Sequence, residues 1–116
     1  MFKLIRDNIP ELMRVEGQPL NFAVAQNDEF YVGLLKGKLI EEVNEYLSSG
    51  DSIEELVDIK TVLDCLIGDR AADFQRVYDE KLKEHGGFEK RYIGFFPDPP
   101  AEGVRNVNAQ TPAKDN

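Results

Sequence analysis

Acidic residues stand beside apolar residues in two consecutive segments, KLIEEVNEYL and IEELVDIKTVLDCL, and this placement constrains the fold more than any other feature of the sequence. Successive helical residues are turned by about 100°, so residues three and four apart share a face. The apolar faces comprise Leu35, Leu39, Val43 and Tyr46 in the first helix, and Ile59, Val62, Leu63 and Leu66 in the second. Glu42 and Glu45 flank the first face, and Glu55 and Asp58 flank the second. We therefore expect two neighbouring helices that hold four carboxylates close to the core.

Carboxylates near a core need positive partners, because an unpaired buried carboxylate costs several kcal/mol. The lysines and arginines that share these faces are too few to neutralise all four acids. Oxygen ligands suit Mg²⁺ or Mn²⁺, and residues three apart on a helix are about 5–6 Å from each other. The pattern therefore predicts a metal site formed by Glu42, Glu45, Glu55 and Asp58, with Glu41 further round. A solvated acidic face, or a subunit interface bridged by lysines, would have the same pattern.

Capping residues and glycines divide the sequence into helical segments. Asn or Asp before a helical pattern caps its first turn, and Gly after the pattern ends it. The short connection at Gly50 predicts that the two central helices are antiparallel neighbours. We therefore expect an all-α, four-helix bundle followed by a flexible tail at residues 97–116. The expected helices cover residues 8–16, 28–49, 52–67 and 70–84, with a loop at 17–27, a break at 68–69 and an extended aromatic segment at 88–96.

Length and charge restrict the class of protein. A chain of 116 residues is long enough for one domain with its own core, which we place at residues 1–96. The net charge of −8 argues against general nucleic-acid binding, because that function needs a basic surface. A small anionic substrate stays compatible with this charge, since a bound metal ion would supply positive charge locally.

Three features predict a cytoplasmic location without membrane attachment. The opening MFKLIRDNIPEL lacks the apolar region of a signal peptide. No run approaches the roughly 18 apolar residues of a membrane-spanning helix. The single cysteine, Cys65, has no partner for an intrachain disulfide, which favours a reducing compartment. Its apolar helical surroundings predict that Cys65 is a small core residue.

Three blocks of sequence resemble a known family. EEVNE at 41–45 and EELVD at 54–58 resemble the EExxE…ExxD pattern of the all-α nucleoside triphosphate pyrophosphohydrolases, the MazG-like superfamily. KLIRDNIPELMRVEG and KLKEHGGFEKRYI resemble its phosphoribosyl-ATP pyrophosphohydrolase-like branch. The resemblance covers about residues 3–93 and implies a helical fold that binds Mg²⁺ through the same four acids. Asn44 stands where the family often has an acid, but this position is expected to face away from the others.

The resemblance also implies the reaction, which is hydrolysis of a nucleoside triphosphate between its α- and β-phosphates. No Ser/His/Asp or Cys/His nucleophile set is apparent in the sequence, which fits direct attack by water. Glu41 and Glu45 are the candidates for the catalytic base. Basic residues should bind the phosphates, and the candidates are Lys3, Arg6, Lys38, Lys81, Lys90 and Arg91. Six aromatic residues could stack on the nucleobase, and the sequence does not choose between them: Phe22, Phe30, Tyr31, Phe88, Tyr92 and Phe95.

Other functions and assemblies stay open at this point. The acids could belong to a non-enzymatic helical module that binds a basic partner surface. The branch name also raises phosphoribosyl-ATP, an intermediate of histidine biosynthesis, as the substrate. Four short helices would leave an apolar stripe uncovered, and pairing of subunits would bury it. Both this argument and the family resemblance predict a homodimer or homotetramer.

Overall fold

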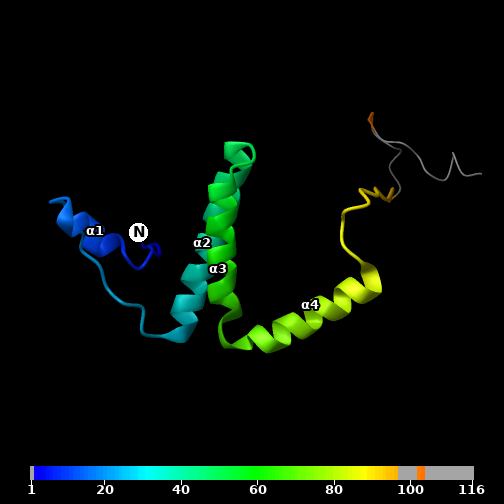
Figure 1. The fold of residues 1–116 in the computed structure, drawn as a ribbon. Coiled ribbons are helices and arrows are strands. Elements are labelled where there is room, and N and C mark those ends of the chain that lie inside the picture. Colours follow the sequence, from blue (N-terminus) through cyan, green and yellow to red (C-terminus); the bar gives the residue numbers. More distant parts are fainter. Residues whose placement is uncertain (1, 97–101, 104–116) are drawn as a thin grey trace, which may run out of the picture. The chain divides into compact units, whose positions relative to one another are not determined.

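All regular structure in the described part of the chain, residues 2–96 and 102–103, is helical (Figure 1). The computed structural model contains α1 (Ile9–Val15), α2 (Asp28–Ser49), α3 (Ile53–Ile67) and α4 (Ala71–His85), with a 3-10 turn, η1 (Gly68–Arg70), before α4. This confirms the all-α class for these residues. The predicted tail at 97–116 lies outside the described residues, apart from 102–103. None of the described helices is both long and apolar enough to cross a membrane.

Local capping chemistry sets the bounds of α2. The side chain of Asn27 accepts a hydrogen bond from the backbone N–H of Phe30 at 3.0 Å, as expected for the residue that caps a helix. At the other end, Gly50 has φ 92°, a conformation that residues with a Cβ rarely adopt. The hydroxyl of Tyr46 donates to the Asp51 carboxylate at 2.7 Å and fastens the connection to the last turns of α2. The predicted helix at 28–49 is therefore confirmed at both ends.

Helices α2 and α3 contact each other and lie side by side (Figure 1). Leu35 on α2 and Val62 on α3 are only 3% and 7% exposed and form the buried seam between them. Val43 and Leu63, predicted to lie on the apolar faces, are 36% and 41% exposed. Two helices cover only the seam where they meet, which is narrower than the apolar arc of either helix.

The prediction that Cys65 is a core residue is wrong for this structure, because Cys65 is exposed. On a helix, Cys65 lies about 60° from Val62, to one side of the seam. Its thiol nevertheless interacts with Tyr31 on α2. Burial, and then a hydrogen bond with Cys65, raises the pKa of the Tyr31 hydroxyl above its usual value.

The chain divides into two units, Met1–Arg76 and Val77–Asn116. The expected break after α3 is a 3-10 turn with Gly68 at φ 54°. In the second unit, Gly86 (φ 77°) follows α4, and its N–H donates to the Leu82 carbonyl at 2.9 Å. The segment at 88–96, expected to be extended, begins instead with a turn in which the Arg91 N–H donates to the Phe88 carbonyl at 3.1 Å.

Candidate metal centre

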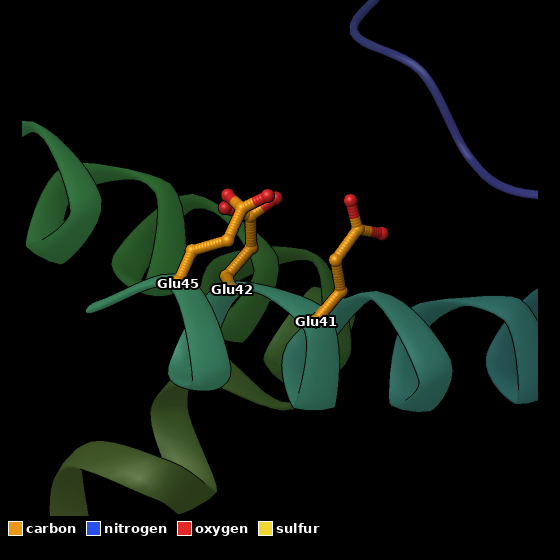
Figure 2. A group of neighbouring side chains, drawn as sticks. All are labelled: Glu41, Glu42 and Glu45. Atoms are coloured by element: carbon orange, nitrogen blue, oxygen red, sulfur yellow. The ribbon is translucent and has the colours of Figure 1, made fainter. Parts of the chain in front are cut away.

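Five carboxylates from α2 and α3 gather in two overlapping groups. Oxygen atoms of Glu41, Glu42 and Glu45 lie within 4.8 Å of one another, and so do oxygen atoms of Glu42, Glu55 and Asp58. Figure 2 shows the side chains of Glu41, Glu42 and Glu45 on the same side of α2, with the carboxyl groups of Glu42 and Glu45 close together. Glu42 belongs to both groups and so connects the acids of the two helices. The four predicted metal ligands are therefore divided between two groups of described residues that share Glu42: Glu55 and Asp58 belong to one, and Glu45 and Glu41 to the other.

The burial of these acids follows from the same helical repeat that forms the core. Glu42 comes seven residues, or about two helical turns, after Leu35, so it continues the buried face of α2. Glu55 comes seven residues before Val62 and continues the buried face of α3 in the same way. The seam between the helices is therefore apolar at Leu35 and Val62 and acidic at Glu42 and Glu55.

Two of the buried oxygen atoms have no hydrogen-bond partner within the described structure. They are Glu42 Oε1 and Glu55 Oε2. Glu42 is only 5% exposed, and its other oxygen is 3.3 Å from Lys38 Nζ. Burial raises the pKa of Glu42 above its ordinary value, the charges of Glu45 and Asp58 raise it further, and Lys38 opposes them. Buried polar atoms almost always have a hydrogen-bond partner or another ligand. These two oxygens are therefore suited to bind a cation, and carboxylate oxygens are ligands that Mg²⁺ prefers.

Three of the six predicted phosphate-binding residues lie against the acids. Lys38 Nζ is 3.5 Å from Glu41 Oε1, in addition to its contact with Glu42. Lys3 Nζ is 3.4 Å from Glu41 Oε2, and Arg6 forms an ion pair with Asp58. The N-terminal segment therefore supplies two positive charges to acids on two different helices.

The other three predicted phosphate-binding residues belong to the second unit. Lys81 is on α4, and Lys90 lies with its Nζ 6.0 Å from the centroid of the Tyr92 ring. Arg91 has φ 63°, a left-handed conformation that is uncommon outside glycine. Their assignment to the phosphate site stays a prediction.

The structure places beside the acids two residues that the sequence patterns did not assign to the site. Thr61 Oγ1 is 3.4 Å from Arg6 Nη2, and it follows Asp58 by one helical turn. Asn44, expected to face away, lines a shallow pocket with Glu45, Ser48, Ser49 and Glu55. The position of Thr61 near the site could have been predicted, because it lies one helical turn after Asp58. The position of Asn44 in the pocket could not, because the pocket forms only where the end of α2 meets the start of α3.

No protein-family model, curated protein or solved structure matches this chain. The site is therefore assigned from the chemistry and geometry of this chain alone.

Proposed function

We propose that this protein is a Mg²⁺-dependent pyrophosphohydrolase that cleaves a nucleoside triphosphate between its α- and β-phosphates and removes surplus or non-standard nucleotides. One observation carries the proposal. Glu42 and Glu55, which belong to the same group of carboxylates, each keep a buried oxygen without a hydrogen-bond partner, and Glu42 is shared with the second group. An acidic surface for a protein partner would not need unpartnered oxygens buried in a helix seam.

The fold we propose is a four-helix bundle of the MazG-like type, with α2 and α3 as its antiparallel central pair. Two observations support the antiparallel arrangement. Tyr31, near the start of α2, interacts with Cys65, near the end of α3. Ser49, at the end of α2, shares a pocket with Glu55, near the start of α3.

Each acid has a role in this proposal. Glu42, Glu45, Glu55 and Asp58 would hold Mg²⁺, which supplies neutralisation of the triphosphate and polarisation of the reacting phosphate when bound. Glu41 contacts Lys3 and Lys38 with its two oxygens, so it anchors these cations beside the site. Glu45 is exposed and lines the pocket. Of the two candidate bases, Glu45 is therefore the better placed to take a proton from the attacking water.

The proposed binding site for the nucleobase of the substrate is a groove at the start of α2. It is lined by Phe30, Gly33 and Leu34 together with residues 24–27 and Glu29. Phe2 packs edge-to-face on Phe30, with ring centroids 6.4 Å apart. Aromatic faces stack on any nucleobase, so this groove supports binding of a nucleotide without fixing which base it carries.

A homodimer or homotetramer is part of the proposal. Ile40 and Leu47 are 63% and 69% exposed and, seven residues apart, lie on one face of α2. Ile53 on α3 is 71% exposed. A second copy would cover exposed apolar side chains of this kind. Analytical ultracentrifugation should give a mass two or four times that of the 13.2 kDa chain, and the mass of a single chain would contradict this part of the proposal.

Pyrophosphate release tests the proposed reaction. The substrates would be a panel of ribo- and deoxyribonucleoside triphosphates and phosphoribosyl-ATP, each with Mg²⁺ and again with EDTA. We expect release with Mg²⁺ only, and a loss of about a hundredfold or more in Glu55→Gln. Glu54→Gln is the matched control, because Glu54 is the exposed neighbour of Glu55 on α3. If no substrate releases pyrophosphate with Mg²⁺ or Mn²⁺, the enzyme proposal fails and a binding module becomes the better account.

A further inference from the structure

Residues 3–6 reach the acidic cluster from outside the helix pair. Lys3 contacts Glu41 on α2, and Arg6 contacts Asp58 on α3. These partners are 38 and 52 residues away in the sequence. Figure 2 shows the N-terminal segment, in blue, on the side of α2 to which the acids point. One short segment therefore spans the acids of both helices.

We propose that Arg6 competes with the metal ion for Asp58, and that metal binding transfers Arg6 from Asp58 to the phosphates of the substrate. This inference rests on the proposed function and goes beyond it, because it couples metal binding to a movement of the N-terminal segment. The observation behind it is that the same carboxylate belongs to an ion pair and to a group that could hold a metal ion. Asp58 is paired with Arg6, and it also belongs to the group formed with Glu42 and Glu55.

Coulomb repulsion makes the two cations alternatives. A divalent ion among Glu42, Glu55 and Asp58 would lie within a few ångströms of the guanidinium that now contacts Asp58, and like charges at that distance repel strongly. Glu42 Oε1 and Glu55 Oε2 still lack partners while Arg6 is in place. Arg6 therefore satisfies only one edge of the cluster, and the buried oxygens stay available to a metal ion.

The pair of Arg6 and Asp58 is suited to exchange. The side chains of Arg6 and Asp58 are 54% and 33% exposed, and ion pairs in contact with water contribute little net stability. Lys38 differs, because its side chain is only 19% exposed and its partner Glu42 is buried. Lys38 is thus a fixed counter-ion and Arg6 an exchangeable one. A guanidinium released beside the metal would meet phosphate oxygens, which it binds with two parallel hydrogen bonds.

Opposite changes in two affinities test this inference. Calorimetric titration with Mn²⁺ alone should show binding about threefold to tenfold tighter in Arg6→Gln than in wild type, because a competing charge is gone. Titration with inorganic tripolyphosphate at saturating Mn²⁺ should show binding about tenfold weaker, because a phosphate ligand is gone. Arg14→Gln is the matched control. It makes the same change in charge at a residue paired with Glu11 in α1, and it should change neither affinity.

A second readout uses the unaltered protein. Hydrogen–deuterium exchange of the amides at residues 3–8 should become faster when Mn²⁺ is added and slower again when tripolyphosphate follows. Two results would overturn the role of Arg6 while leaving the metal site intact. One is Mn²⁺ binding in Arg6→Gln that is equal to or weaker than in wild type. The other is hydrogen–deuterium exchange at residues 3–8 that does not change when Mn²⁺ is added. Absence of Mn²⁺ binding in wild type would overturn both the inference and the proposed function.

Discussion

Glu42 is the residue on which the candidate site depends most. It is 5% exposed, it belongs to both acid groups, and one of its oxygens has no hydrogen-bond partner. Burial is the main reason that its pKa is raised. In the metal-free protein this carboxylate therefore destabilises the fold, and a cation bound beside it would relieve that cost.

The first prediction concerns pH. Because the pKa of Glu42 is higher in the folded protein than its ordinary value of 4.5, the folded protein binds this proton more tightly than the unfolded chain. The contribution of Glu42 to stability is thus present at pH below 4.5 and is lost as pH rises through the raised pKa. Without metal, Glu42→Gln should melt at a higher temperature than wild type at pH 8, and the difference should become smaller as the pH is lowered towards 4.5.

Thermal melting in EDTA at several pH values measures this difference, with Glu54→Gln as the control for loss of one charge. A melting temperature of Glu42→Gln equal to or below that of wild type at pH 8 would show that Lys38 already compensates the buried charge.

At the scale of elements, the helix pair α2–α3 carries both the core and the site. The seam contains Leu35 and Val62 on the apolar side and Glu42 and Glu55 on the acidic side. Packing at the apolar part should therefore determine whether the acids stay together.

The second prediction tests this seam. Leu35→Ala removes a side chain that is 3% exposed and should lower the free energy of unfolding by about 2–5 kcal/mol. Leu12→Ala is the control of equal size, at a residue that is 53% exposed on α1, and it should cost less than about 1 kcal/mol. Urea unfolding followed by circular dichroism measures both. Equal losses in the two variants would show that the seam is not the core.

The sequence predicts the positions of the helices better than it predicts which of their side chains are buried. The helix at 28–49 is confirmed because its caps, Asn27 and Gly50, are local signals. The positions of Glu42 and Glu55 followed from the helical repeat alone. The exposure of Cys65 did not, because a projection gives the direction of a side chain without the width of the seam. The contact of Arg6 with Asp58 could not be predicted either, because the two residues are 52 positions apart in the sequence.

For the whole molecule, negative charge is the dominant property. The net charge is −8, and five acids are concentrated on one pair of helices. A ligand that binds the folded state alone stabilises it in proportion to the logarithm of its concentration. Divalent metal should therefore affect the stability of the entire protein.

The third prediction is that Mg²⁺ raises the melting temperature. At a Mg²⁺ concentration a hundred times its dissociation constant, the gain in stability would be about 2.7 kcal/mol. NaCl at the same ionic strength should give a much smaller rise, since it only screens charge. Glu55→Gln should lose most of the response to Mg²⁺, and Glu54→Gln should keep it. An unchanged melting temperature at saturating Mg²⁺ would count against a metal site in this seam.

The most direct test of the metal centre is an anomalous difference map from crystals grown with MnCl₂. We predict a strong peak between α2 and α3, bounded by carboxyl oxygens of Glu42, Glu55 and Asp58. A map without a peak there, in crystals whose acidic cluster is ordered and free of lattice contacts, would contradict the central claim that this seam holds a divalent metal ion.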